Sequence, residues 1–168
     1  MNRFAELLDR LAYEPGRNNK LRLLTSYFRK VEDPDRGYAL AAFTGALSFK
    51  HAKPGLIRDL IAARTDPVLF ALSYDYVGDL SETVALMWPK AVSDREVSLP
   101  EYPPPPALTE VVTTLRTLGK TDLPKQLARW LDELDETGRW ALLKLVTGAM
   151  RIGISARLAK TAAAELGD

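Results

Sequence analysis

Val146-Thr147-Gly148-Ala149-Met150-Arg151-Ile152-Gly153-Ile154-Ser155 joins two stretches of helical periodicity near the end of the chain. Before it, the apolar residues between Arg139 and Val146 are spaced as in a helix that is buried over much of its surface. After it, Ser155 can cap a helix from Ala156 to about Leu166, which leaves N–H groups and the positive end of the helix dipole exposed. The stretch therefore predicts two helices joined by a loop that can bind an anion.

The composition of this loop suits phosphate. Gly148 and Gly153 allow a close approach of another backbone, and Arg151 can bind phosphate with two parallel hydrogen bonds. A glycine pair between helices is also typical of a simple C-cap and turn, so that interpretation stays open. The surrounding segment favours the anion site, because it holds five basic residues and no acid: Arg139, Lys144, Arg151, Arg157 and Lys160.

A similar pattern occurs earlier in the chain. Ala42-Phe43-Thr44-Gly45-Ala46-Leu47-Ser48-Phe49 aligns without gaps with residues 145–152, at an offset of 103 residues. A long offset favours two related helical halves over a short-period solenoid. The earlier loop continues with Lys50, Lys53 and Pro54, so it is also basic, and the proline suits the first turn of a helix. The two loops could hold two neighbouring strands of a phosphate polymer, although a solvated surface charge explains each lysine equally well.

Composition excludes several classes of function. The 168 residues fit one domain, or two small helical halves, with enough apolar residues for a core. The sequence has no cysteine and a single histidine, His51, which argues against a zinc site and a histidine-dependent triad. No secretion signal or membrane-spanning apolar run is found, so we expect a soluble cytoplasmic protein. The net charge of +1 leaves room for a local basic patch.

One such patch is predicted near the start of the chain. The segment from Arg17 to Lys30 contains basic residues but no acid. Asn18, Asn19 and Lys20 are candidate phosphate-binding residues within it. One of the two asparagines is also expected to cap the helix.

Helical periodicity dominates the whole chain and predicts an all-α fold. Helices are expected from about Asp35 to Leu47, over 54–63, over 66–75 and after Asp79. Pro100 and the run Pro103-Pro104-Pro105-Pro106 predict an extended connector over 91–106, which divides a helical half at 1–90 from another at 107–168.

Gly78-Asp79-Leu80-Ser81-Glu82-Thr83 is the second informative stretch. Asp79 and Glu82 have the spacing of a capping box, which explains them as a helix start without any chemistry. Together with Asp75 they could alternatively form a Mg²⁺ site. The acids between Asp132 and Glu136 are expected on an exposed helix face.

Two of these stretches resemble the N-terminal DNA-binding domain of ATP-dependent DNA ligases, of bacterial type. Residues 78–83 are similar to a Gly-Asp-Leu-x-Glu-Thr motif of that family. Residues 139–155 are similar to its motif Arg-Trp-x-Leu-Leu-Lys-x-Val-Thr-Gly-x-Met-Arg-Ile-Gly-Ile-Ser. The resemblance covers nearly the whole chain in order, and the two motifs together are more specific than either alone.

The resemblance implies an all-helical domain that holds both strands of nicked duplex DNA by their backbones on the minor-groove side, without sequence preference. The loop residues implied to contact phosphate are Gly148, Arg151, Gly153 and Ser155. Ala149 departs from relatives with a basic residue there, which puts one contact in doubt. Arg157 is a further DNA-binding candidate beside the loop.

The catalytic part of such an enzyme is not evident in this sequence. The Lys-x-Asp-Gly motif of the adenylated lysine has only a distant counterpart, Lys120-Thr121-Asp122-Leu123, which lacks the glycine. We therefore expect a monomeric, nucleoid-associated DNA-binding part of a ligase. ATP and Mg²⁺ would act in the complete enzyme, where the partners are nucleotidyltransferase and OB-fold domains. The alternative is a helical protein-interaction scaffold that does not bind DNA.

Overall fold

The computed structural model describes residues 1–47, 49, 53–89, 106–147 and 155–165. These residues form ten α-helices and no strand, which confirms the all-α prediction. In chain order the helices are α1 (Asn2–Tyr13), α2 (Arg17–Lys30), α3 (Asp35–Phe43), α4 (Pro54–Arg64), α5 (Pro67–Val77), α6 (Leu80–Met87), α7 (Leu108–Thr117), α8 (Leu123–Glu133), α9 (Glu136–Thr147) and α10 (Ala156–Ala164).

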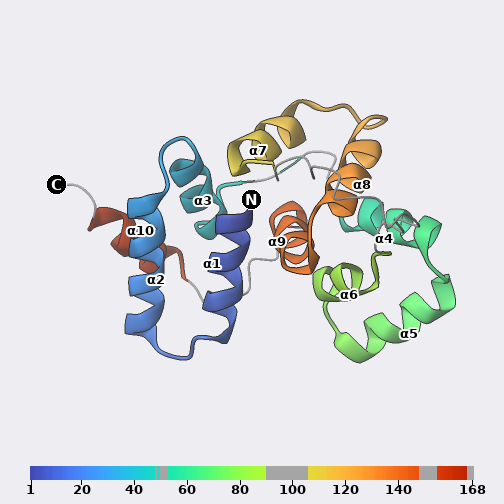
Figure 1. Cartoon of the computed structure of the whole chain (residues 1–168), viewed down its shortest axis with the longest axis horizontal. Coiled ribbons are helices and arrows are strands. Elements are labelled where there is room, and N and C mark those ends of the chain that lie inside the picture. Colours follow the sequence, from blue (N-terminus) through green and yellow to red (C-terminus); the bar gives the residue numbers. More distant parts are fainter. Residues whose placement is uncertain (48, 50–52, 90–105, 148–154, 166–168) are drawn as a thin grey trace, which may run out of the picture.

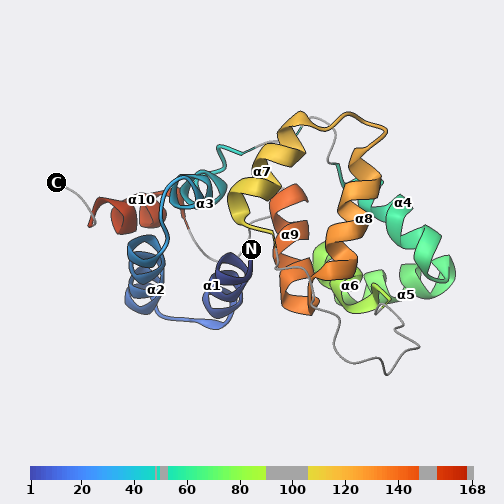
Figure 2. The same ribbon diagram turned by 45° about the horizontal axis from the view of Figure 1, so that its top comes forward.

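The helices form an elongated molecule with α1 and α9 near its middle (Figure 1). Helices α2 and α10 lie at one end, and α4 and α5 lie at the other (Figure 1). The turned view in Figure 2 again shows α1 and α9 side by side, in agreement with their packing contact. Helix α9 also packs against α6, so it joins the two ends of the molecule.

The offset of 103 residues relates more than the two loops. It carries α1, α2, α3 and α4 onto α7, α8, α9 and α10, and all of the paired helix ends agree within three residues. Packing between the two sets is reciprocal. Helix α1 packs against α9 as α7 packs against α3, and α2 packs against α10 as α8 packs against α4. Helices of each set therefore pack against helices of the other set. These contacts join residues on both sides of the predicted connector at 91–106, and the division of the chain there stays a prediction.

Aromatic side chains join the first three helices. Phe4 of α1 lies 6.4 Å from Tyr27 of α2 and 5.9 Å from Phe43 of α3, between ring centroids. All three side chains are buried. Burial of each such ring stabilises the fold by about 2 kcal/mol relative to exposure, so this cluster fixes how α1 to α3 pack.

Two polar contacts connect Met1 and α3 to the segment that begins α7. The α-ammonium group of Met1 donates to the carbonyl oxygen of Pro106 at 2.7 Å. The carboxylate of Asp35 accepts from the backbone N–H of Thr109 at 2.8 Å and from its hydroxyl. Because Ala107 has no side chain able to cap α7, Asp35 takes that role from another helix.

Local start and stop rules account for most helix ends. Pro54 and Ser155 begin α4 and α10 as predicted. The predicted cap of α2 by Asn18 or Asn19 is wrong. The N-cap is Gly16, two residues before Asn18. The carboxylate of Glu14 accepts both from the Gly16 N–H and from the Asn19 amide, which fixes the turn before α2.

The third helix ends at Phe43, four residues before the predicted end. The hydroxyl of Thr44 bonds back to the carbonyl of Leu40 at 3.0 Å, and Gly45 adopts a φ of 75°. A left-handed glycine after a helix is a common stop.

The prediction that the acids from Asp132 to Glu136 only form an exposed helix face is incomplete, because two of them bind other parts of the chain. Asp132 accepts from the Trp88 indole at 2.9 Å and pairs with Arg64 at 3.0 Å, which joins α4, α8 and the end of α6. Asp135 accepts from the N–H of Gly138 at 2.7 Å and so caps α9. Both carboxylates therefore hold helices in place.

An ion pair connects the two sequence motifs. The ammonium group of Lys144 on α9 lies 2.6 Å from the Asp79 carboxylate, whose other oxygen caps α6 by accepting from Glu82 N–H at 2.8 Å. Lys144 is only 4% exposed. Burial alone would raise the pKa of Asp79, but the hydrogen bonds from Lys144 and Glu82 outweigh it and lower that pKa.

We expect Asp79→Asn to lower the free energy of unfolding by about 2 kcal/mol at pH 7, because asparagine still caps α6 but leaves the Lys144 ammonium buried without a counter-charge. Since the folded-state pKa of Asp79 is depressed, the contribution is present above the unfolded-state pKa of about 4 and is lost as the pH falls through the folded-state value. Urea unfolding at several pH values measures it. A difference that stays constant down to pH 2 contradicts this role.

Gly78 ends α5 with a φ of 76°, and no atom lies near the position that a side chain would occupy. Gly78→Ala should therefore destabilise the chain by about 1 kcal/mol through backbone strain alone. Gly55→Ala is the control, because that position also has open space but no positive φ. Equal midpoints of thermal unfolding for the two variants would show that the left-handed conformation costs nothing.

Candidate nucleic-acid interface

The N-terminus of α10 carries the predicted cap. The hydroxyl of Ser155 accepts from the N–H of Leu158 at 3.1 Å, and its backbone is extended. Ser155, Arg157 and Lys160 are exposed, whereas Leu158 is buried. The first turn of α10 therefore offers solvent a positive dipole end with two cations nearby.

The basic segment around this helix divides into two kinds of residue. Arg139 and Lys144 are buried and serve the fold rather than a ligand. The Arg139 guanidinium donates to the carbonyl oxygen of Leu131 at 2.6 Å. Burial lowers its pKa, an effect that the charges of Asp132 and Asp135 oppose. Among the described cations of this segment, Arg157 and Lys160 are the ones exposed to an anion.

Helix α2 places further cations beside α10. The two helices pack together, and Thr25 of α2 donates to the carboxylate of Glu165, just after α10, at 3.2 Å. A groove of about 570 Å³ runs along this part of α2. Its lining includes the exposed side chains of Asn18, Arg22 and Arg29. Sequence reasoning did not select the two arginines, although residues 18, 22 and 29 recur at the spacing of one helix face.

The predicted residues of the first α2 turn have different surroundings. Asn18 is exposed at the groove. Asn19 donates to Glu14 at 3.3 Å, so its amide also serves the turn between α1 and α2. Lys20 is half-buried.

The remaining predictions fall on the two loops. Lys53 is exposed at the N-cap of α4. Helices α4 and α10, which begin just after Lys53 and Ser155, lie on opposite sides of α1 and α9 (Figures 1 and 2). Lys50, Gly148, Arg151 and Gly153 lie outside the described residues.

A metal site at the start of α6 is not supported. No group of three or more potential metal ligands is found among the residues that the structure describes, so Asp75, Asp79 and Glu82 form no such cluster. Asp79 is instead used by Lys144 and by the α6 cap. Within the same ranges, every helix is too short or too polar to cross a bilayer.

Comparison with known proteins agrees with the two motifs and with the helical architecture. A search of curated proteins finds no match. The family model described as DNA ligase N terminus matches residues 1–164, nearly the whole chain. On this match the chain belongs to the family of DNA ligase N-terminal domains.

Proposed function

We propose that this domain binds nicked duplex DNA through backbone phosphates on the minor-groove side, without sequence preference, as part of an ATP-dependent DNA ligase in repair or replication. The observations that carry the proposal are the exposed basic face of α2, a helix that packs against α10, and the exposed, capped N-terminus of α10, in a chain of the DNA ligase family. We call this surface, formed by Asn18, Arg22, Arg29, Ser155 and Arg157, the α2/α10 surface.

Phosphate binding follows from the chemistry of this surface. Arginine side chains and free N–H groups at a helix start recognise phosphate oxygens, which are the same at every base pair. Arg151, Gly148 and Gly153 would complete the contact in the adjoining loop. Binding of this kind positions the duplex but reads no bases.

The repeated architecture supports contact with both strands. The two strands of a duplex are related by local two-fold symmetry, and a chain with two equivalent helix–loop–helix units can offer similar groups to each. The equivalent units here are α3–α4 with Lys50 and Lys53, and α9–α10 with Arg151 and Ser155.

The chemistry of sealing is assigned to other parts of the enzyme. ATP and Mg²⁺ would act in nucleotidyltransferase and OB-fold domains, since this chain has no Lys-x-Asp-Gly motif. The domain itself would hold DNA as a cytoplasmic monomer. A scaffold that does not bind DNA is the alternative, and it predicts no salt-dependent association.

Fluorescence anisotropy with nicked and intact duplexes of scrambled sequence, over a salt series, tests the proposal. We expect equal affinity for all sequences and tighter binding to the nicked duplex. The logarithm of the association constant should fall with the logarithm of salt concentration by about 0.9 per phosphate contacted. Absence of binding at low salt would favour the scaffold.

Substitutions then locate the surface. Arg151→Ala and Arg157→Ala should each weaken binding to every duplex and reduce the salt slope by about one, because each removes one phosphate contact. Arg10→Ala is the matched control, since Arg10 is an exposed arginine that pairs with Glu6 on α1. If Arg157→Ala binds DNA as tightly as Arg10→Ala, the α2/α10 surface is not the DNA contact.

A further inference from the structure

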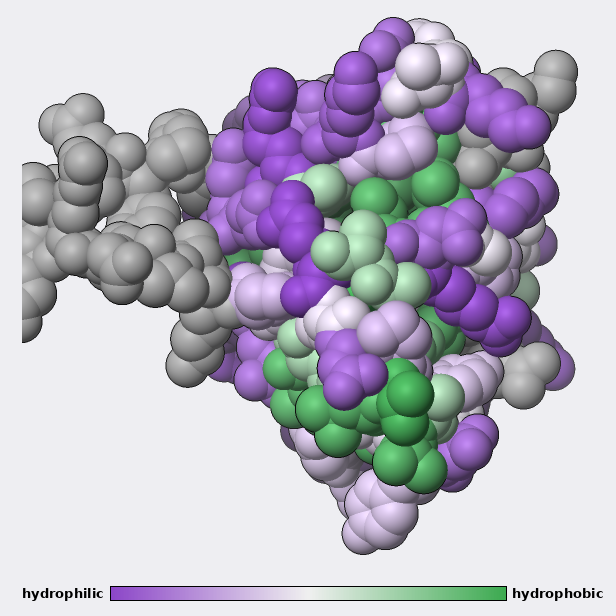
Figure 3. All heavy atoms as spheres, turned by 90° about the vertical axis from the view of Figure 1, so that its right-hand side faces the viewer, coloured by the Kyte–Doolittle hydropathy of each residue, from purple (hydrophilic) through white to green (hydrophobic). Residues whose placement is uncertain are grey.

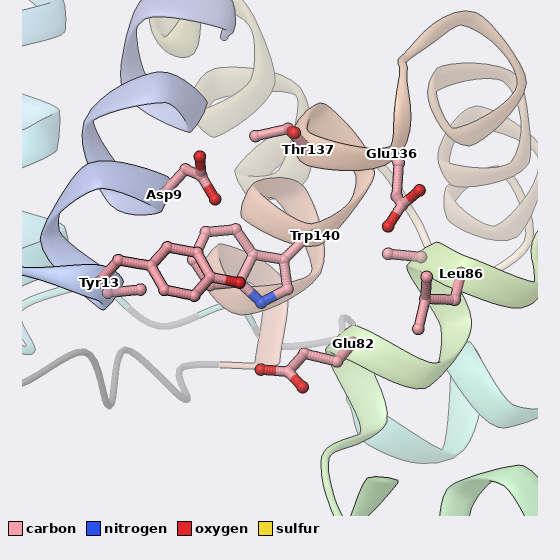
Figure 4. A pocket seen from close by; sticks show the side chains of 9 residues that line it. Asp9, Tyr13, Glu82, Leu86, Glu136, Thr137 and Trp140 are labelled. Atoms are coloured by element: carbon pink, nitrogen blue, oxygen red, sulfur yellow. The ribbon is translucent and has the colours of Figure 1, made fainter.

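A second hollow lies away from the α2/α10 surface, between α1, α6 and α9. It encloses about 380 Å³ and is shown in Figure 4. Each of the three helices contributes one acidic residue, namely Asp9, Glu82 and Glu136. We call it the acidic cleft.

The cleft has one sign of charge. No lysine or arginine lines it, and no hydrogen bond or ion pair within the described residues reaches the carboxylates of Asp9, Glu82 or Glu136. With three acids in its lining, the cleft attracts a cation. DNA, a polyanion, is repelled from the same place.

The lining of the cleft suits an organic cation better than a metal ion. Within the described residues, the three carboxylates do not form a metal-binding group. Figure 4 shows Trp140 among the three acids and Tyr13 on the α1 side, below Asp9. Tyr13 is 83% exposed and Trp140 is half-buried. Aromatic faces attract guanidinium and ammonium groups, and arginine also stacks on them. A basic side chain therefore matches both the charge and the shape of the lining.

An apolar surface continues from the cleft. Leu86 lines the cleft and also a neighbouring hollow of about 370 Å³, which Leu72 and Tyr76 of α5 line on its other side. These side chains are 60%, 63% and 92% exposed, and no residue of α5 is buried. Figure 3, which faces the end of the molecule that carries α4 and α5, shows apolar residues gathered in its lower part.

Exposed apolar side chains are less favourable in water than side chains that a partner covers. Contiguous exposed apolar residues are uncommon on monomeric proteins and mark interaction sites. The cleft also restricts which partners fit, because a bound segment must place a cation in the cleft and apolar side chains on α5. We propose that the acidic cleft and the apolar face of α5 together bind a segment of a partner protein in which an arginine or lysine lies next to apolar residues. Occupancy is compatible with DNA on the α2/α10 surface, and the inference does not depend on DNA binding.

The probe for this site is the peptide acetyl-Gly-Arg-Ala-Leu-Leu-Ala-Leu-amide. Two matched peptides carry glutamate in place of the arginine, or serine in place of each leucine. The chain has three tryptophans, of which Trp88 and Trp130 are buried. The indole N–H resonance of Trp140, assigned with Trp140→Phe, therefore reports on the cleft.

The arginine peptide should shift the Trp140 resonance and leave those of Trp88 and Trp130 in place. We expect a dissociation constant on the order of 100 μM for so short a segment. The glutamate peptide should not bind. The serine peptide should bind about tenfold more weakly, because it loses the apolar contacts with α5.

Variants of the chain test the charge directly. Glu82→Gln with Glu136→Gln should weaken the arginine peptide by about tenfold, while Glu133→Gln, an exposed acid of α8 outside the cleft, should have no effect. Equal binding of the arginine and glutamate peptides overturns the proposal, as does equal loss in the Glu133→Gln control. Concentration-dependent dimerisation that Leu72→Ser abolishes also overturns it, because a second copy would then cover α5.

Discussion

Helix α9 is buried along nearly its whole length, and its buried polar groups need partners on other helices. Its sequence includes Arg139 and Lys144, whose charges must therefore find partners inside the protein. The carbonyl oxygen of Leu131 accepts a hydrogen bond from the Arg139 guanidinium, and the Asp79 carboxylate forms an ion pair with Lys144. These contacts fix α8 and the start of α6 against α9. Because α1 packs on another side of α9, the same helix sets the distance between the α2/α10 end of the molecule and the α4/α5 end.

The burial of α9 also separates structural cations from those available to a ligand. Five basic residues lie between positions 139 and 160, yet the two on α9 are unavailable to solvent. Positive charge at the surface instead comes from Arg157 and Lys160 on α10 and from the neighbouring face of α2. Acids also gather in one place, since Asp9, Glu82 and Glu136 lie on the cleft side of α1, α6 and α9. A nearly neutral chain can thus present two surfaces of opposite sign.

Features that depend on neighbours in sequence could be predicted from the sequence. The caps by Asp79 and Ser155 and the helix start at Pro54 follow from rules that span three or four residues. Features that depend on distant partners could not. Nothing near Lys144 in the sequence announces its pairing with Asp79, 65 residues away. The same reason explains why Asp132 was expected on an exposed face, since its partners Arg64 and Trp88 belong to other helices.

The exchange of helices between the two repeated sets has a consequence for how the chain acquires its structure. Thr25 and Glu165 are 140 residues apart in sequence and in contact in the fold. Helices α1 and α2 therefore leave the ribosome with apolar faces that stay uncovered until α9 and α10 have been synthesised. Closing such long loops slows folding. During that interval the early helices present a surface for chaperones or for wrong pairings, and a cut within residues 91–106 would separate each set from the helices that cover it.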